Sequence, residues 1–395
     1  MPTRRLQAIP CPLEAASVAA FLPLLRAALD GGPALLPMPL GPARQVDQLR
    51  HELRPDVGVD EATTVVVATS GSTGTPKGVQ LSSAALRAST RATHQRLGGP
   101  GHWLLALPVH HIAGLQVLVR TIDGGGVLST VDSTTGFTTA LFVAAAAELP
   151  HDAPRYTALV PTQLARLLDD VAAVSALASF DGVLLGGSAS PVPLLDRARA
   201  AGIPVRTTYG MSETAGGCVY DGEPLDGTRV DAGDDGVGAI RLGGATLSHG
   251  YLHRPDLTDA AFADGWFTTG DLGRWTPQRR LEVLGRVDDL IISGGENVVP
   301  LLVERALTDV AGVRDACVVG IPDEEWGQAV VAVVVPADPA APPATGALRD
   351  AVAGRVGRHA VPKRLSLVDA VPQLESGKAD RAAVAALLAA ASRAT

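Results

Sequence analysis

Residues 69–78, with the sequence TSGSTGTPKG, combine hydroxyl side chains, glycines and a lysine in one short segment. Glycines let backbone N–H groups approach an anion closely and hydroxyls donate further hydrogen bonds, so the segment is typical of a loop that binds phosphate. It differs from a Walker loop, in which glycine precedes the lysine and Ser or Thr follows it, because Lys77 lies between Pro76 and Gly78. Read alone, SGSTG also fits a solvated connector. The chain has only three lysines, however, so the lysine favours a ligand-binding loop.

Four more segments carry charged side chains next to glycines or hydroxyls. Glu213 lies in the segment YGMSET, and Asp271 ends the triplet TGD. Carboxylate oxygens are ligands that Mg²⁺ prefers, and an ionised carboxylate can accept hydrogen bonds from sugar hydroxyls. The other two segments are GRVDDLIISGGENV, at residues 285–298, and ESGKADR, at residues 375–381, which contains Lys378.

These five segments, in this order, resemble the motifs of the acyl-adenylate-forming superfamily, which includes acyl-CoA synthetases, luciferases and peptide-synthetase adenylation domains. The resemblance spans residues 63–381 and implies that ATP activates a carboxylic acid as an acyl-adenylate. The triphosphate repels the carboxylate that attacks it, so the enzyme must neutralise both anions and hold them in line. By this resemblance, Lys378 bridges the substrate carboxylate and the α-phosphate, Glu213 binds Mg²⁺, and Thr214 lies near the α-phosphate.

The same resemblance implies a nucleotide site. It places Tyr209 and the segment LLGGSAS beside the adenine, assigns Asp271 and Arg286 to the ribose, and leaves Lys77 to steady the loop and the departing pyrophosphate. The expected nucleotide-binding residues are Thr69, Ser70, Gly71, Ser72, Thr73, Gly74, Thr75, Lys77, Gly187, Ser188, Thr208, Tyr209, Gly210, Met211, Ser212, Asp271 and Arg286.

A second step, in which the thiol of coenzyme A takes the acyl group, is also implied by the resemblance. In the family the small domain rotates about a hinge residue, which corresponds here to Asp288, and the rotation exchanges the catalytic lysine for the loop ISGGEN. Gly294 and Gly295 of this loop would let the backbone approach the pantetheine, and Trp326 resembles a tryptophan that lines coenzyme A in aryl-CoA ligases. The implied cofactors are therefore ATP, Mg²⁺ and coenzyme A.

The sequence constrains the identity of the acid less than it constrains the nucleotide and coenzyme A sites. The segment PVHHIAGL resembles the part of the family that guards the acyl pocket, so His111 is the candidate gate and is counted among the catalytic residues. TALVPTQLARLL resembles the corresponding segment of o-succinylbenzoate:CoA ligases of menaquinone biosynthesis. That substrate has a second carboxylate, and a buried anion requires a cation or several donors. The polar candidates for this carboxylate, among which the sequence does not choose, are His110, His111, Arg120, Gln163 and Ser188.

Composition limits the other classes of partner. The net charge is −8 and no basic cluster is long enough to follow a phosphate backbone, so we expect no nucleic-acid partner. The three cysteines are far apart and fit reduced thiols. No apolar run approaches the roughly 20 residues of a membrane span, and the N-terminus lacks the apolar core of a signal peptide. We therefore expect a cytoplasmic protein that acts on a small-molecule carboxylic acid, with a homo-oligomer left open.

Alternation of β-branched runs with helical segments between residues 63 and 209 predicts an α/β fold with layered sheets. Short runs cut by glycine then predict a small β-rich part. We expect a large N-terminal nucleotide- and acyl-binding domain, residues 1–287, and a small mobile α+β C-terminal domain, residues 288–395, that carries Lys378. The expected helices lie near residues 13–29, 83–97, 114–121, 138–149, 162–170, 193–201, 300–308, 346–356 and 380–392.

The sequence thus predicts an AMP-forming acid:CoA ligase that most resembles the o-succinylbenzoate:CoA ligases. Alternatives within the superfamily are another aryl- or short-chain acyl-CoA ligase and an adenylation enzyme that loads a carrier protein. A non-catalytic nucleotide-binding homologue is the alternative from a different class.

Overall fold

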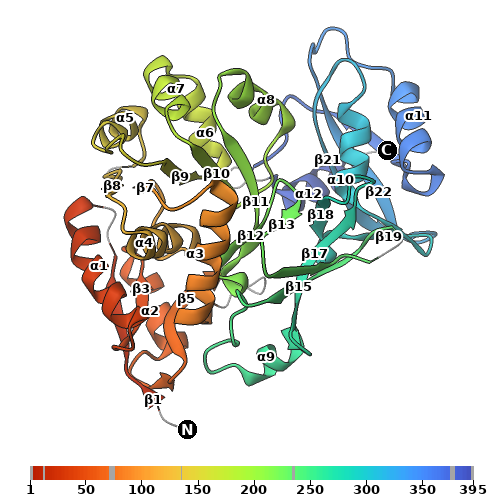
Figure 1. Cartoon of the computed structure of the whole chain (residues 1–395). Coiled ribbons are helices and arrows are strands. Elements are labelled where there is room, and N and C mark those ends of the chain that lie inside the picture. Colours follow the sequence, from red (N-terminus) through yellow and green to blue (C-terminus); the bar gives the residue numbers. More distant parts are fainter. Residues whose placement is uncertain are drawn as a thin grey trace. The chain divides into compact units, whose positions relative to one another are not determined.

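The structure, a computed structural model shown in Figure 1, describes residues 3–11, 14–70, 76–134, 136–233, 236–373 and 379–392. The chain folds into two compact units. Strands β15 (Gly238–Gly244) and β17 (Trp266–Trp275) each contribute residues to both units, and Asp288 belongs to the second. Unit 1 comprises Met1–Asp231, Arg241–Thr269 and Thr276–Leu281, and unit 2 comprises Ala232–Ile240, Gly270–Trp275 and Glu282–Thr395.

The first sheet of unit 1 has the strand order β2-β3-β5-β6. Strands β2, β3 and β5 are parallel. Strand β6 pairs antiparallel with β5, and the two strands contain the ends of residues 69–78, which are called the phosphate-loop motif below. Helices α1, α2 and α3 pack against this sheet. The elements of this region are β1 (Thr3–Arg4), β2 (Leu6–Pro10), α1 (Ala15–Leu29), β3 (Ala34–Met38), α2 (Ala43–Leu53), β4 (Val59–Asp60), β5 (Thr63–Ser70), β6 (Pro76–Ser82) and α3 (Ser83–Leu97).

The second sheet of unit 1 has seven strands in the order β13-β12-β11-β10-β9-β7-β8. The strands from β8 to β11 are parallel, and β12 and β13 extend the sheet antiparallel. Its elements are β7 (His102–Leu105), α4 (Ile112–Gly124), β8 (Leu128–Thr130), α5 (Thr139–Ala147), β9 (Arg155–Leu159), α6 (Pro161–Leu168), α7 (Val171–Ala178), β10 (Gly182–Leu185), α8 (Val192–Ala200), β11 (Val205–Met211), η1 (Ser212–Thr214), β12 (Gly216–Tyr220) and β13 (Glu223–Pro224).

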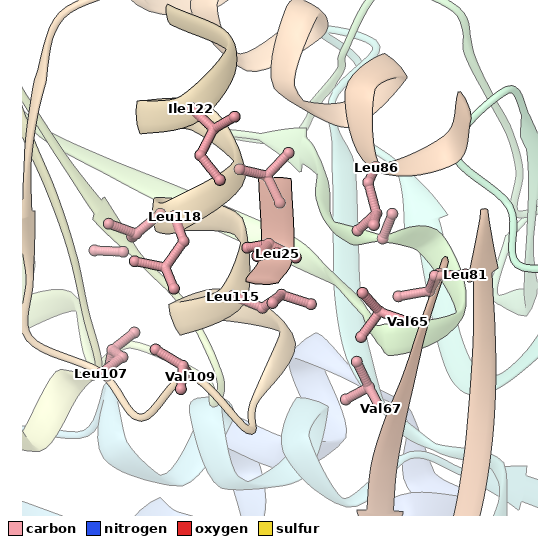
Figure 2. Packing of buried hydrophobic residues seen from close by; sticks show 14 of the residues in the cluster. Leu25, Val65, Val67, Leu81, Leu86, Leu107, Val109, Leu115, Leu118 and Ile122 are labelled. Atoms are coloured by element: carbon pink, nitrogen blue, oxygen red, sulfur yellow. The ribbon is translucent and has the colours of Figure 1, made fainter. Parts of the chain in front are cut away.

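Helix α4 lies in the main core of unit 1. Leu115, Leu118 and Ile122 of α4 share one buried cluster with Leu25 of α1 and Leu86 of α3, as Figure 2 shows. Burial of one such aliphatic side chain contributes about 1.5–3 kcal/mol. The helix is therefore held firmly in place, which fixes the position of the histidines at its N-terminus.

The β-rich region that the glycine pattern predicts follows β13 along the chain, and its strands β15 and β17 contribute residues to both units. β14 (Thr228–Asp231) pairs antiparallel with β15, and β16 (Phe262–Ala263) pairs antiparallel with β17. A short helix, α9 (Pro255–Ala261), precedes β16 and has no buried residue.

Unit 2 contains a five-stranded sheet in which β20, β19, β22 and β21 are neighbours and β23 pairs with β22. Helices α10 and α11 share a buried cluster with this sheet, and α12 packs against β21. The elements are β18 (Leu281–Arg286), η2 (Val287–Asp289), β19 (Ile291–Ser293), β20 (Glu296–Val298), α10 (Pro300–Thr308), β21 (Val313–Asp323), β22 (Gly327–Pro336), α11 (Thr345–Arg355), η3 (Arg358–Ala360), β23 (Arg364–Leu367) and α12 (Arg381–Ser392).

The predicted α/β class with layered sheets is confirmed, and each of the nine expected helices has a counterpart within a few residues. Helices α2, α7 and α9 were not expected. The sequence of α2, ARQVDQLRHEL, is mostly polar, and α7 and α9 are short, so none of them has the apolar periodicity from which a helix is inferred. No helix among the described residues is long and apolar enough to cross a membrane.

Candidate active site

The carboxyl ends of β9, β10 and β11 meet at one edge of the seven-stranded sheet, because these three strands are parallel neighbours. Ligands of α/β sheets bind at such edges. Gly186 follows β10 here, and a Cβ at this position would lie 2.3 Å from Oγ1 of Thr208, whose hydroxyl donates to the Leu185 carbonyl. Gly186, which directly precedes the predicted residues Gly187 and Ser188, therefore lies beside Thr208. Gly187 and Ser188 are both exposed.

The YGMSET segment forms a tight turn from β11 through η1 into β12. Gly210 has φ +157°, and a Cβ on it would lie 2.2 Å from the Gly216 carbonyl oxygen, so only glycine fits. The buried Thr214 hydroxyl accepts a hydrogen bond from the Met211 N–H at 3.0 Å and lies 2.8 Å from the Gly216 carbonyl oxygen, to which it can donate. Thr214 thus closes the turn from inside, while Glu213 between Ser212 and Thr214 keeps partial exposure.

Helix α4 holds this turn in place. Gln116, which is fully buried, donates from Nε2 to the Ala215 carbonyl at 2.7 Å, and its Oε1 accepts from the Thr90 hydroxyl at 3.2 Å. Ala215 has φ 51°, a left-handed conformation that costs a non-glycine residue about 1 kcal/mol or more. The Gln116 bond stabilises this strained residue and ties the turn to the helix that begins beside His111.

Lys77, Tyr251 and Glu213 lie together although 174 residues separate the first of them from the second in the sequence. The Tyr251 hydroxyl donates to Oε1 of Glu213 at 2.9 Å, and Nζ of Lys77 lies 5.4 Å from the centroid of the Tyr251 ring. Thr69 lies opposite Lys77 in the β5–β6 pair, and its hydroxyl lies 3.4 Å from the Lys77 carbonyl oxygen. Lys77 is therefore connected to the expected metal ligand through Tyr251.

The sequence reasoning missed Tyr251, Gln116 and Ala215 as parts of this site. Tyr251 lies in a region of short runs cut by glycine, where no periodicity marks a residue as buried, and only its pairing with β6 brings it to the site. The signals that could have found it are its position directly after Gly250 and the small number of tyrosines, four in the whole chain.

His110 and His111 lie at the N-terminus of α4 with ring centroids 4.3 Å apart. Burial, with a smaller contribution from His111, lowers the pKa of His110 to about 4. His111 keeps exposed surface, yet desolvation by its surroundings also lowers its pKa. Both rings are therefore neutral near pH 7. Gly114 lets the first turn of α4 pack closely against the segment that precedes it, because a Cβ at Gly114 would lie 2.3 Å from the Pro108 carbonyl oxygen.

The candidates for binding a second carboxylate differ in their exposure and in the contacts that their side chains already make. The amide of Gln163 donates to the Ala106 carbonyl at 2.8 Å and accepts from the Val160 N–H at 3.1 Å, so both of its functions are used. Ser188 is exposed. Arg120 is 3% exposed, lies against the Trp103 ring, and has no carboxylate partner among the residues that the structure describes.

In unit 2, Arg286 connects two of the predicted functional carboxylates. Its Nη1 donates to Oδ1 of Asp271 at 3.3 Å, and its Nη2 lies 3.8 Å from Oδ2 of Asp288. Gly270 allows this approach, because a Cβ there would lie 2.4 Å from Nη2 of Arg286. The structure therefore brings the expected ribose-binding pair together and places the predicted hinge residue beside it.

The predicted coenzyme A residues also form one group in unit 2. A Cβ on Gly294, which has φ +60°, would lie 2.7 Å from the Trp326 ring, and the Gly294 N–H donates to the Trp326 carbonyl at 2.9 Å. Gly295 follows at φ +83°. Nζ of Lys363 lies 3.7 Å from the centroid of the Trp326 ring, a cation–π contact that the sequence did not predict.

Several predicted residues lie outside the described part of the chain: Gly71, Ser72, Thr73, Gly74, Thr75 and Lys378. The segments that flank them are described. Ser70 pairs with Pro76 at the base of the phosphate-loop motif. Gln373 pairs with Ala379, and the Asp380 N–H donates to the Pro372 carbonyl at 2.8 Å, at the base of the segment that contains Lys378.

The described residues fit magnesium carried by a nucleotide better than a metal held by protein ligands alone. They include no cluster of three or more His, Cys, Asp or Glu side chains that could hold a metal ion. Glu213 bonds to Tyr251 through Oε1, and its Oε2 makes no hydrogen bond or ion pair with the described residues. Mg²⁺ typically takes one or two carboxylates, with substrate phosphates and water completing its six ligands. Glu213 is suited to be such a carboxylate.

Two segments of the chain match known protein families. Residues 23–252 match the AMP-binding enzyme family, and residues 302–378 match the AMP-binding enzyme C-terminal domain. The chain is 46% identical over 379 residues to the "Probable 2-succinylbenzoate--CoA ligase" of Mycobacterium tuberculosis (strain ATCC 25618 / H37Rv). The aligned residues cover 93% of this chain and 95% of the relative. It is 31% identical over 363 residues to the "2-succinylbenzoate--CoA ligase" of Bacillus subtilis (strain 168), with coverage of 84% and 72%.

Solved structures agree with these relatives. The o-succinylbenzoate CoA synthetase (MenE) from Bacillus subtilis in complex with the acyl-adenylate intermediate OSB-AMP is 29% identical, with a TM-score of 0.66 and coverage of 92% of this chain and 80% of that chain. The same protein in complex with ATP and magnesium ion is 28% identical, with a TM-score of 0.70 and coverage of 96% and 89%. The predicted resemblance is confirmed: this chain belongs to the AMP-binding enzyme family, the acyl-adenylate-forming superfamily.

Proposed function

We propose that this protein is an AMP-forming acid:CoA ligase that converts o-succinylbenzoate to its coenzyme A thioester, in the cytoplasm and as part of menaquinone biosynthesis. The observation that carries the proposal is the 46% identity to a probable 2-succinylbenzoate–CoA ligase over almost the full length of both chains. The grouping of Lys77, Tyr251 and Glu213, and of Asp271 with Arg286, supports the same chemistry.

In the first step, a carboxylate oxygen of the acid attacks the α-phosphorus of ATP. The bond from this phosphorus to the bridging oxygen breaks, pyrophosphate leaves, and the acyl-adenylate remains. Asp271 accepts hydrogen bonds from the ribose hydroxyls and Arg286 donates to the same sugar, while Tyr209 and the turn at Gly187 flank the adenine. Mg²⁺, when bound, neutralises charge on the phosphate oxygens, and Glu213 is the residue that would hold it.

Two lysines have separate roles in this step. Lys77 of β6 contacts the ring of Tyr251, whose hydroxyl bonds to Glu213, and it balances the charge of the departing pyrophosphate. Lys378 bridges the attacking carboxylate and the α-phosphate. A unit positive charge about 4 Å from each anion is worth up to roughly 4 kcal/mol per pair at an effective dielectric constant of 20. The hydroxyl of Thr214 maintains the turn that presents Glu213, and the neutral His111 borders the acyl group.

In the second step, the thiol sulfur of coenzyme A attacks the acyl carbon. A carbon–sulfur bond forms, the bond from the acyl carbon to the phosphate oxygen breaks, AMP leaves, and the thiol proton passes to solvent or to a nearby base. Rotation about Asp288 withdraws Lys378 and brings in Gly294 and Gly295. The Trp326 ring, with its face toward the Lys363 ammonium, lines the path of coenzyme A.

Arg120 supports o-succinylbenzoate as the acid. Burial lowers its pKa, but a guanidinium stays charged near pH 7, and a buried cation without a carboxylate partner is costly. The carboxylate that is not activated would pair with this guanidinium.

The test is a panel of acids that includes o-succinylbenzoate, benzoate and short aliphatic acids, assayed with the purified full chain. Exchange of labelled pyrophosphate into ATP reports adenylation, and formation of a thioester with free coenzyme A reports the second step. We expect o-succinylbenzoate to give the highest rate in both assays. If no acid supports pyrophosphate exchange, the protein is a nucleotide-binding homologue without catalytic activity. If exchange occurs but no thioester forms with free coenzyme A, the protein loads the acyl group onto a carrier protein.

A further inference from the structure

Tyr251 lies between the lysine of the phosphate-loop motif and the carboxylate expected to hold magnesium, and it contacts both. We infer that Tyr251 is a positioning residue, which fixes Oε1 of Glu213 so that Oε2 faces the metal–nucleotide complex. This inference rests on the proposed magnesium role of Glu213. Tyr251 is not assigned to any function by the motifs in the sequence.

The hydroxyl forms the first contact. The Tyr251 O–H donates to Oε1 of Glu213 at 2.9 Å, and Tyr251 is only 7% exposed. A phenol keeps its proton near neutral pH, so the Tyr251 hydroxyl acts as the donor in this bond. A hydrogen bond to a carboxylate is stronger than one between neutral groups. This bond therefore selects one orientation of a carboxylate that is otherwise partly exposed.

The backbone of Tyr251 is fixed independently of its side chain. Tyr251 forms an antiparallel bridge with Val79 of β6, and its N–H donates to the Thr258 hydroxyl at 2.9 Å. Gly250, with φ +130°, leaves room for this contact, because a Cβ there would lie 2.5 Å from Thr258. The Glu213 carbonyl also accepts from the Ser248 N–H at 2.8 Å. The segment 248–251 is thus connected to Glu213 through the backbone of Ser248 and through the side chain of Tyr251.

The ring forms the second contact. Nζ of Lys77 lies 5.4 Å from the ring centroid, within the distance at which a cation is attracted to an aromatic face. Among the described residues Lys77 forms no ion pair, and its ammonium contacts the face of the Tyr251 ring. One side chain therefore orders a cation for the phosphates and an anion for the metal.

Two substitutions separate the contacts. Tyr251→Phe removes the hydroxyl and keeps the ring, whereas Tyr251→Leu removes both. Tyr156→Phe is the matched control, because Tyr156 is a fully buried tyrosine of unit 1 whose hydroxyl donates to the Leu97 and Gly99 carbonyls. Glu213→Gln tests the metal role itself. Calorimetry measures the Kd of each full-length variant for ATP, once with Mg²⁺ and once with EDTA, and the ratio of the two values gives the gain from magnesium.

We expect Glu213→Gln to abolish most of this gain. Tyr251→Phe should reduce it about tenfold, the effect of losing one hydrogen bond to a charged group, without changing the Kd in EDTA. Tyr251→Leu should in addition weaken binding in EDTA about threefold, because Lys77 loses its partner. Tyr156→Phe should match the wild type in both conditions.

The other outcomes separate this inference from the proposed function. If Glu213→Gln abolishes the gain but Tyr251→Phe behaves like Tyr156→Phe, the positioning role of Tyr251 is wrong and the metal role stands. If Glu213→Gln keeps the full gain, the metal role fails and the inference fails with it. If Tyr251→Phe loses ATP affinity equally with Mg²⁺ and with EDTA, the substitution causes a general loss of structure, and this result also overturns the inference.

Discussion

The guanidinium carbon of Arg120 lies 5.1 Å from the centroid of the Trp103 ring, and both side chains are buried in the core of unit 1. The cation–π contact offsets part of the cost of burying this charge. Nε of Arg120 nevertheless has no hydrogen-bond partner within the described part of the chain. The proposed function assigns the second carboxylate of the substrate as the partner of this guanidinium.

Arg120→Leu should therefore lower kcat/KM for o-succinylbenzoate by about 100-fold or more, because truncating one partner of a buried charge pair costs about 2–5 kcal/mol. The rate with benzoate, which has no second carboxylate, should change little. Steady-state kinetics with both acids measures the effect, and Arg96→Leu, a partly exposed arginine of α3 in the same unit, is the control. An equal loss with both acids would contradict the assignment.

Lys378→Ala should reduce pyrophosphate exchange by at least about 100-fold, since removing one group that stabilises developing charge costs about that much. The same variant should convert preformed acyl-adenylate and coenzyme A to thioester within a few-fold of the wild-type rate, because the lysine is withdrawn in the second geometry. Single-turnover assays measure the two steps separately. Arg355→Ala, an exposed residue at the end of α11, is the control, and equal loss in both steps would refute rotation about Asp288.

Gly210→Ala should destabilise unit 1 by roughly 2 kcal/mol or more and weaken ATP binding, because the new Cβ would lie 2.2 Å from the Gly216 carbonyl oxygen. Gly354→Ala is the matched control. It lies in α11 with no atom within 4 Å of its Cβ position, so alanine should be neutral or stabilise by up to about 1 kcal/mol. Denaturant unfolding and calorimetry with ATP measure both effects. A stable Gly210→Ala with normal ATP affinity would show that the turn tolerates a side chain.

His94 should make the protein less stable in mild acid. Burial, and to a lesser degree the Arg120 charge, lower its pKa from 6.5 to about 4. Between these two pH values the unfolded chain binds a proton that the folded chain excludes, so the unfolding free energy falls as the pH falls, by up to about 3 kcal/mol. Below about pH 4 this contribution no longer changes.

His94→Leu should therefore give a shallower dependence of the unfolding free energy on pH between 4 and 6.5, measured by urea unfolding at several pH values. His51→Leu, at an exposed histidine of α2, is the matched control and should keep the slope of the wild type. A slope that is the same in His94→Leu and the wild type would exclude His94 as its origin.

The sequence by itself was sufficient to predict the chemistry and most of the elements around it. The phosphate-loop motif (residues 69–78), YGMSET and TGD are short runs of residues that can be recognised in the sequence without knowledge of the fold. Helices such as α3 and α10 were predicted within a residue because apolar periodicity and end signals are also local properties. The predicted hinge at Asp288 and the roles of the motif residues stay predictions.

The tertiary structure alone decided which distant residues meet. Tyr251 reaches Glu213 and Lys77 only because its segment pairs with β6, and Gln116 reaches Ala215 only because α4 packs beside β12. Arg120 is one of five polar candidates in the sequence, and only its burial without a carboxylate partner in the described residues distinguishes it. Such relationships depend on burial and on contacts between segments far apart in the chain, which no local pattern of residue types encodes.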